Sequence, residues 1–294
     1  MELDNYINEL FEKGYTMIPD VINQDEILEY ISEFNKWMDS IENIDELHNM
    51  IHFHGIFKYF NPGHQRFAWL LRTNPKIQNI FKKIWNTDEL VTSFDGCCYY
   101  PKKYDKKDVY WVHSDQSCLK KGLKCVQSFI SLTKNKEKTF IVFEYTHKLH
   151  EVYGDIYQVD NPSDWNPICE EYTNCISDSA KILHVEPGSM VLWDSRTFHQ
   201  NSCGTPESVE DRLVQYLCFL PKNVPENNNE EKEKRKYYFE NQFTTNHYPY
   251  PMNHVPKQPY NYNRANPDNQ IVIDYDNLPP PYLDDLMPEI QKLL

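Results

Sequence analysis

The 294-residue sequence has no long apolar run, no paired-cysteine motif and no excess of basic residues. Apolar runs such as Phe140–Phe143 are far too short to cross a bilayer. The first residues, Met1–Asp4, do not form the basic stretch followed by an apolar one that a secretion signal needs. We therefore expect a protein with no membrane span, located in the cytoplasm.

Basic residues are the scarcer charge, because 30 Lys and Arg stand against 44 Asp and Glu, for a formal net charge of −14. Affinity for nucleic acid comes mostly from clustered basic side chains that neutralise phosphates, so we expect no nucleic-acid partner. The eight cysteines include no CxxC pair, and a chain of this length does not need disulfides to fold. They are expected to be thiols in a reducing compartment.

Apolar residues make up 40% of the chain and aromatic residues 14%, which is enough to build a core, and one large domain is expected at this length. Near the N-terminus, apolar residues recur at helical spacing over 2–13. Asn23 followed by Glu26 resembles a capping box and predicts a second helix to about residue 38. Pro75 opens a third helix.

The pattern changes at about residue 90, where short β-type runs alternate with polar connections, as in an antiparallel barrel or sandwich. We expect helices in residues 1–88 and a barrel in residues 89–221, together forming one domain. Residues 145–180 form a long polar excursion, either a lid or peripheral decoration. Residues 222–294, rich in Pro, Tyr and Asn, are expected to wrap the domain in extended form, with a short helix at 283–294. Strands are expected near 90–100, 109–115, 125–132, 139–144, 181–185, 189–194 and 211–220.

A group of metal-ligand residue types lies in the predicted barrel. Residues two apart on a strand project to the same side, so His113 and Asp115 can reach one point. Such a triplet arises often by chance, and a third ligand is required. His199, at the end of the strand that follows the turn Pro187–Ser189, is the candidate. Two imidazoles and one carboxylate suit Fe(II), because they leave positions open for an oxoacid and O₂.

Arg212 begins the run Arg212–Leu220, which otherwise has the composition of a buried strand. A buried guanidinium is costly unless an anion neutralises it, and its planar fork matches a carboxylate. The distal carboxylate of 2-oxoglutarate is one candidate partner, and a neighbouring Asp211 or Glu210 is the alternative. Gln127, on the strand after the His113–Asp115 loop, is a further candidate for a hydrogen bond to the oxoacid.

Several short motifs follow one another between about residue 9 and residue 221. In order they are Glu12–Pro19, His113-Ser114-Asp115, Thr146-His147-Lys148, Pro187-Gly188-Ser189, His199 and Arg212. This combination resembles the phytanoyl-coenzyme A dioxygenase family, within the wider 2-oxoglutarate oxygenases. The chain departs from the family pattern at Lys138-Thr139, where Gly is usual, and at Glu144-Tyr145, where Pro-Gly is common. These departures leave every proposed ligand in place.

The resemblance implies a mainly β, double-stranded β-helix: a cupin-like jelly-roll barrel with the N-terminal helices packed outside. It implies Fe(II) held by His113, Asp115 and His199, 2-oxoglutarate anchored by Arg212, and O₂ as co-substrate. Succinate and CO₂ would be released as a small or lipid-like molecule is oxidised. Halogenating relatives replace the carboxylate, so the presence of Asp115 leads us to expect hydroxylation.

Two other function classes remain open. One is a catalytically inactive barrel that binds a ligand or a partner, although an intact ligand set with Arg212 argues against a decayed site. The other is a metal-dependent cupin-type enzyme that does not use 2-oxoglutarate; such sites more often have extra histidines and do not need Arg212. The sequence determines neither the substrate nor the oligomeric state.

Overall fold

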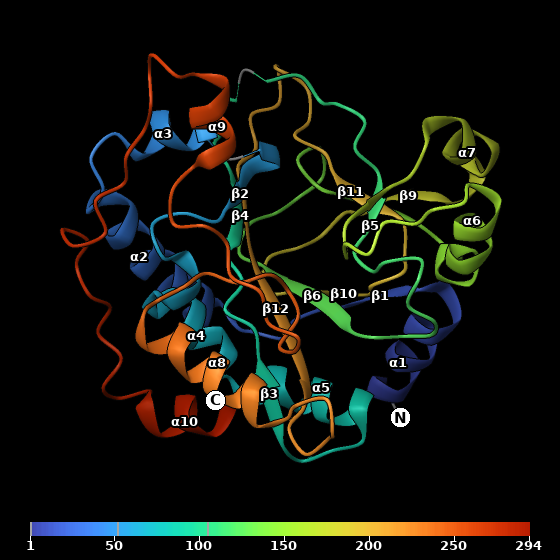
Figure 1. Cartoon of the computed structure of the whole chain (residues 1–294), viewed down its shortest axis with the longest axis horizontal. Coiled ribbons are helices and arrows are strands. Elements are labelled where there is room, and N and C mark those ends of the chain that lie inside the picture. The colour runs from blue at the N-terminus through green and yellow to red at the C-terminus, as the bar shows by residue number, and fades with distance from the viewer. Residues whose placement is uncertain (1, 52, 105) are drawn as a thin grey trace. The chain divides into compact units, whose positions relative to one another are not determined.

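The computed structural model describes residues 2–51, 53–104 and 106–294 (Figure 1). The chain divides into two compact units, each described here by itself. Unit 1 consists of Met1–Val21 and Tyr100–Leu213, and unit 2 of Ile22–Tyr99 and Val214–Leu294. Each unit therefore combines segments that are far apart in the sequence. The division into a domain of residues 1–221 and a C-terminal segment remains a prediction.

Unit 1 begins with the predicted helix, α1 (Glu2–Lys13), which is followed by the strand β1 (Tyr15–Ile18). Gly14 separates them with a φ of 90°, and its N–H donates to the carbonyl oxygen of Leu10 at 2.8 Å. A Cβ atom at this position would lie 2.4 Å from Nδ1 of His147. Glycine is therefore required here by both its conformation and the lack of space.

Two antiparallel sheets form the body of unit 1. In the first, β10 (Met190–Asp194) lies between β1 and β6 (Val126–Ser131), so that Trp193 pairs with Tyr15 on one side and Gln127 on the other. The second has the strand order β8 (Asn166–Pro167), β5 (His113–Ser114), β11 (His199–Asn201), β7 (Phe140–Phe143) and β9 (Ala180–Ile182).

Aromatic side chains join the two sheets of unit 1. The ring of Phe140, from β7, lies 5.6 Å from that of Phe129 on β6 and 4.9 Å from that of Trp193 on β10, measured between centroids. All three side chains are buried. Two antiparallel sheets packed through such a core, with helices around them, fit a jelly-roll-like fold.

The segment 145–180 is more structured than a polar excursion. It contains α6 (His150–Ile156), α7 (Glu170–Cys175) and the 3₁₀ turns η3 (Thr146–Lys148) and η4 (Ser177–Ser179). Tyr153 and Ile168 from this segment are buried in a cluster with Val112, Phe143 and Phe198. The apolar residues are too widely spaced in the sequence to reveal this cluster, which forms only when the segment folds against β7 and β11.

Unit 2 contains the predicted helices α2 (Gln24–Asp39), with both hydrogen bonds of the Asn23–Glu26 capping box, and α5 (Pro75–Trp85). The sequence analysis missed α3 (Ile44–Ile51) and α4 (Arg66–Arg72), which are short. The 3₁₀ turns η1 (Phe53–Gly55) and η2 (Pro62–His64) lie between them in the sequence.

The strands of unit 2 are β2 (Ile56–Phe57), β3 (Leu90–Thr92), β4 (Cys97–Tyr100) and β12 (Arg212–Pro221). Strand β12 begins in unit 1 and pairs with β3 and β4.

Three helices lie in the C-terminal segment of unit 2: α8 (Asn229–Glu240), α9 (Tyr260–Ala265) and α10 (Met287–Leu293). α10 falls within the helix expected at 283–294, whereas α9 interrupts a stretch expected to be extended. α8 forms in a strongly charged run because Asn228 caps it and because its buried Arg235 donates to Asn227 and to the carbonyl oxygen of Pro249. The chain is thus not purely β.

The helices of residues 2–51, 53–104 and 106–294 include none with the length and hydropathy needed to cross a membrane. Within the same residues, the eight cysteines form no disulfide.

Candidate metal centre

The structure brings His113, Asp115 and His199 together within unit 1. His113 and His199 are paired residues on the neighbouring strands β5 and β11, and their ring centroids are 4.4 Å apart. Asp115 follows β5, and its backbone N–H donates to the carbonyl oxygen of Ser195 at 2.9 Å. One potential ligand atom from each residue lies within 4.8 Å of the other two. Such a group is compact enough to hold one metal ion.

The orientation of both imidazoles is set by the backbone two residues earlier. Nδ1 of His113 lies 2.9 Å from the carbonyl oxygen of Trp111, and Nδ1 of His199 lies 2.8 Å from that of Thr197. A carbonyl oxygen only accepts, so each Nδ1 must carry the proton and donate it. Each Nε2 then has its lone pair available in a neutral ring. This is how protein histidines are prepared for metal binding.

Both Nε2 atoms face the Asp115 carboxylate. The distance from Nε2 of His113 to Oδ1 of Asp115 is 3.6 Å, and that from Nε2 of His199 to Oδ2 is 3.2 Å. The two histidines are each 4% exposed, whereas the Asp115 side chain is 15% exposed. The three donors thus converge at a site that is nearly closed to solvent on the histidine side.

Aromatic rings pack around the two histidines. Trp111 stacks on His113 with centroids 4.7 Å apart and an interplanar angle of 25°. The rings of Phe140 and Trp193 lie 5.1 Å and 5.4 Å from that of His199. This packing restricts the rotation of the imidazoles, so their donors are held in place before any ligand arrives.

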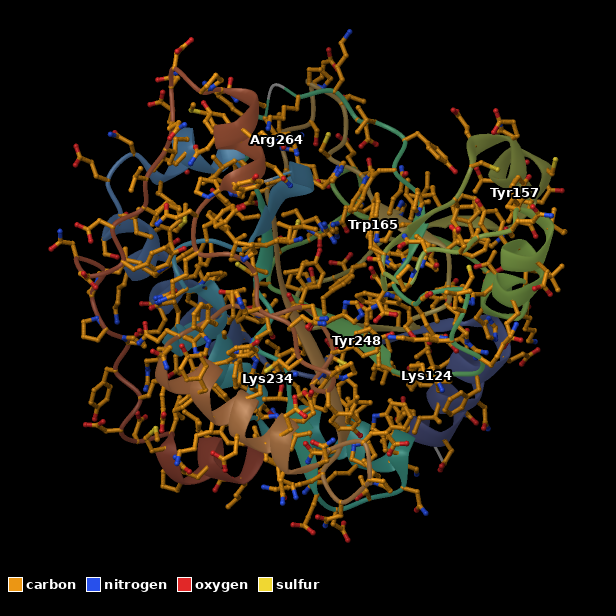
Figure 2. The ribbon with its side chains drawn as sticks, viewed as in Figure 1. Lys124, Tyr157, Trp165, Lys234, Tyr248 and Arg264 are labelled. Atoms are coloured by element: carbon orange, nitrogen blue, oxygen red, sulfur yellow. The ribbon has the colours of Figure 1, made fainter. Side chains whose placement is uncertain are left out.

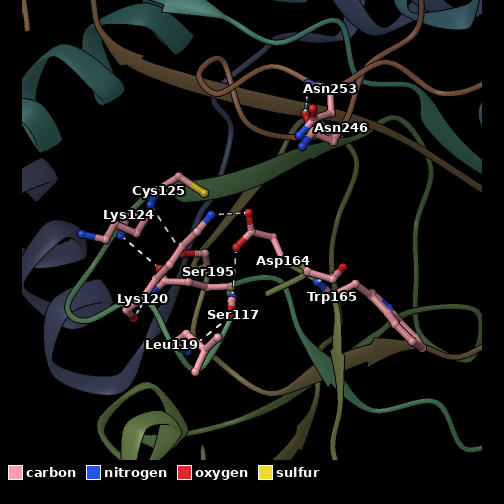
Figure 3. A network of polar contacts seen from close by, with 12 residues as sticks. Ser117, Leu119, Lys120, Lys124, Cys125, Asp164, Trp165, Ser195, Asn246 and Asn253 are labelled. Atoms are coloured by element: carbon pink, nitrogen blue, oxygen red, sulfur yellow. Dashed lines mark hydrogen bonds and ion pairs between the residues drawn. The ribbon is translucent and has the colours of Figure 1, made fainter. Parts of the chain in front are cut away.

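Gln116, directly after the carboxylate, organises the loop that carries it. Its Nε2 donates to the carbonyl oxygens of Lys120 and Gly122, and its Oε1 accepts from Ser195 Oγ at 2.8 Å and from the N–H of Lys124 at 3.1 Å. Figure 3 shows Lys120, Lys124 and Ser195 around this loop. The sequence analysis missed Gln116, whose position next to the His113–Asp115 motif was the only signal available.

Gln127 contacts the carboxylate directly, because its Nε2 donates to Oδ2 of Asp115 at 3.0 Å. Gln127 lies on β6, so the first sheet of unit 1 supports Asp115, a candidate ligand that follows a strand of the second sheet. The predicted hydrogen bond from Gln127 to 2-oxoglutarate remains a prediction. What the geometry adds is a role for this amide in orienting Asp115.

Arg212 is completely buried, and its guanidinium carbon lies 5.4 Å from the centroid of the Phe129 ring. Phe129 is two residues beyond Gln127, so the two side chains share one face of β6 and are about 7 Å apart along the strand. Arg212 therefore lies on the sheet face that also supports Asp115. Glu210, considered above as its ion partner, accepts hydrogen bonds from the backbone N–H groups of 136–138.

The Thr146-His147-Lys148 motif has a structural part in positioning β11. Thr146 donates its hydroxyl proton to the carbonyl oxygen of Phe143 and accepts from the N–H of Phe198, the residue before the candidate ligand His199. His147 Nε2 is bonded to the carbonyl oxygen of Phe11, which connects the turn with α1. The motif fixes the approach of the chain to the site and contributes no side chain to the ligand set.

Comparison with known proteins gives relatives of the fold. No family model matches the chain. A protein named "Ava biosynthesis cluster protein O" from Aspergillus versicolor is 27% identical over 266 residues, which cover 83% of this chain and 85% of the relative.

Two solved structures are similar in fold at low sequence identity. The hypothetical protein JW0805 from Escherichia coli has a TM-score of 0.63 at 14% identity, covering 87% of this chain and 76% of its own. The epimerase SnoN, solved with Fe³⁺, alpha-ketoglutarate and nogalamycin RO, has a TM-score of 0.52 at 14% identity, covering 75% of this chain and 84% of its own. The chain shares the fold of these proteins.

Proposed function

We propose that this protein is an Fe(II)- and 2-oxoglutarate-dependent oxygenase that hydroxylates a small organic molecule. The observation that carries the proposal is the convergence of His113, Asp115 and His199, with donor atoms within 4.8 Å of one another. A set of two histidines and one carboxylate is typical of non-haem Fe(II) oxygenases. The fold relative SnoN was solved with Fe³⁺ and alpha-ketoglutarate, which supports the same cofactors here.

The residues fit an iron ion by the chemistry of their donors. His113 and His199 offer neutral Nε2 atoms, because each Nδ1 donates to a backbone carbonyl oxygen. Asp115 offers a carboxylate, and the hydrogen bond from Gln127 to its Oδ2 restricts its rotation. His113, Asp115 and His199 would hold the ion, and three protein ligands leave positions for an oxoacid and O₂.

Arg212 is the residue proposed to bind the distal carboxylate of 2-oxoglutarate. It is buried, and its planar guanidinium can bind a carboxylate through two parallel hydrogen bonds. Arg212 lies over the ring of Phe129, which is about 7 Å along β6 from Gln127, the residue that contacts Asp115. This spacing is comparable to the length of a five-carbon dicarboxylate. Burial keeps water from competing for the guanidinium.

When bound, iron would activate O₂ as the oxidant with 2-oxoglutarate as co-substrate, so that 2-oxoglutarate would be oxidised to succinate and CO₂ while the second oxygen atom of O₂ would go to the substrate. The chain's own residues hold the reactants and exclude water. Asp115 occupies the ligand position that a halogenating enzyme would leave open for halide, and for this reason we propose hydroxylation. SnoN is described as an epimerase, so the fold also serves other outcomes.

The proposed substrate class is a small molecule. The name of the Aspergillus versicolor relative refers to a biosynthesis cluster, and SnoN was solved with nogalamycin RO. The motif order that resembles the phytanoyl-coenzyme A dioxygenase family makes a lipid-like member of that class a second possibility to screen.

The test is an anaerobic titration of the Fe(II)-loaded protein with 2-oxoglutarate, following the weak visible charge-transfer band of the chelate. We expect the band in the wild type, and a requirement for roughly 30-fold more 2-oxoglutarate in Arg212→Ala, because the distal carboxylate loses a buried charged partner. Arg212→Lys keeps the charge without the fork and should fall between the two.

Other results of this titration would favour one of the two alternative functions. Iron binding with no band would favour a cupin-type enzyme that does not use 2-oxoglutarate. No iron binding at all would favour a binding protein. A band that is equally easy to saturate in Arg212→Ala would contradict the role of Arg212.

A further inference from the structure

Trp165 is an exposed aromatic side chain next to the metal centre. We propose that it forms one wall of the substrate site and that the substrate carries a planar ring system that packs on the indole. This inference rests on the proposed function and adds to it the chemical class of the substrate.

The position of Trp165 is fixed relative to a proposed iron ligand. Its ring centroid lies 5.8 Å from that of His113, at an interplanar angle of 34°. The next residue, Asn166, begins β8 and pairs with Ser114, which lies between His113 and Asp115. Trp165 is therefore connected to the ligand strand by a β ladder.

The indole of Trp165 packs near His113 but is itself only half buried. His113 is 4% exposed, whereas Trp165 is 49% exposed. All six tryptophans lie within the described residues, and among them Trp165 is the one whose side chain is largely open to solvent. About half of a large apolar side chain thus remains accessible, on a ring whose centroid lies 5.8 Å from that of His113, and a binding partner would gain by covering it.

The loop that carries Trp165 is held at several points (Figure 3). Asp164 forms an ion pair with Lys120 at 2.5 Å and accepts from the N–H of Ser117 at 3.0 Å. Ser117 Oγ donates to the carbonyl oxygen of Asn161 at 2.7 Å, and Asn166 donates to that of Gln116 at 3.0 Å. These contacts connect the loop to the segment directly after Asp115.

The fixed loop favours recognition by shape. A side chain that is already ordered loses little conformational entropy when a ligand packs on it. An indole offers a flat surface with a quadrupole, so it favours an offset-stacked or edge-to-face aromatic ring over a saturated ring of the same size. Trp165 therefore favours a planar ring as the part of the substrate held next to the metal.

The experiment uses the protein loaded with Co(II) and 2-oxoglutarate, with 2-naphthol as probe and its saturated counterpart decahydro-2-naphthol as matched control. Affinity is measured by NMR titration of the probe, and proximity to the metal by the line broadening that Co(II) causes relative to Zn(II). Trp165→Ala, Trp165→Phe and Tyr157→Ala are compared, the last removing another exposed aromatic side chain of unit 1, at the end of α6 (Figure 2).

We expect 2-naphthol to be broadened by Co(II) and to bind about three- to tenfold more weakly to Trp165→Ala. Its affinity should stay within about twofold in Trp165→Phe and in Tyr157→Ala. Decahydro-2-naphthol should lose only about twofold in Trp165→Ala, less than 2-naphthol, because the saturated ring loses apolar contact but no ring stacking.

Two results would overturn the inference alone: 2-naphthol affinity unchanged in Trp165→Ala, or no Co(II) broadening in protein shown to bind both Co(II) and 2-oxoglutarate. Failure to bind Co(II) and 2-oxoglutarate would instead overturn the proposed function, and this inference with it.

Discussion

Two buried histidines of unit 1, His113 and His199, differ in their hydrogen bonding from His64 of unit 2. In unit 1, Nδ1 of His113 and of His199 is bonded to the carbonyl oxygen two residues earlier, and Nε2 faces Asp115. In unit 2, it is Nε2 of His64 that lies 2.8 Å from a carbonyl oxygen, that of Phe243. The same residue type, equally buried, thus presents a different nitrogen to its surroundings.

The surroundings of His64 explain its structural role. Its ring packs against Phe94 and Phe239, at centroid distances of 4.9 Å and 6.0 Å. Burial, together with the nearby charges of Arg72 and Lys257, lowers the pKa of His64 to about 3. A histidine becomes a ligand when the backbone takes its Nδ1 and a carboxylate faces its Nε2; burial alone produces a neutral core residue.

The largest expected difference is in Fe(II) binding when one histidine is replaced in each unit. His199→Ala should weaken Fe(II) binding by about 100-fold or more, because a ligand is lost, whereas His64→Gln should leave it within about threefold. Isothermal titration calorimetry under anaerobic conditions measures both. Equal losses in the two variants would mean that His199 acts only through the fold.

A smaller effect is expected when the orientation of the carboxylate is disturbed. Gln127→Leu keeps the size of the side chain but removes the hydrogen bond to Oδ2 of Asp115, and should weaken Fe(II) binding by roughly 10-fold. The same titration provides the measurement. Gln127→Glu, which places a second carboxylate at this position, distinguishes loss of the hydrogen bond from a change in packing.

The lowered pKa of His64 should make the stability of the apo protein depend on pH. Its folded pKa is lowered to about 3 from an ordinary 6.5, so the unfolded chain binds more protons below pH 6.5 and stability falls as the pH is lowered towards 3. Between pH 7 and pH 5, His64 alone should remove about 2 kcal/mol from the free energy of unfolding. Urea unfolding at both values should show this part missing in His64→Gln; an identical loss in the two proteins would contradict it.

The last prediction concerns which ring nitrogen of each histidine carries the proton. In long-range ¹H–¹⁵N spectra of the apo protein, the neutral form of His113 and of His199 should carry its proton on Nδ1, and that of His64 on Nε2. Single His→Gln variants assign the signals. Finding His199 in the Nε2–H form would remove the argument that the backbone prepares it as a ligand.

Much of the local structure was predictable. The helix over 2–13, the capping box at Asn23 and the strand after Arg212 follow from periodicity and cap chemistry within a few residues, and the structure confirms them. The strand expected over 109–115 is short, with β5 limited to His113–Ser114. The hydrogen bonds that end it, such as that from Trp111 N–H to Gln200, come from residues about 90 positions away.

The candidate site divides in the same way. The sequence by itself determined the ligand types, the two-residue spacing of His113 and Asp115, and a buried arginine on the last strand, because these depend on residue chemistry and strand periodicity. Only the tertiary structure placed His199 opposite His113, directed Gln127 to Asp115 and set Trp165 beside the site. Those arrangements depend on strand pairing and loop closure between distant segments, which no local pattern specifies.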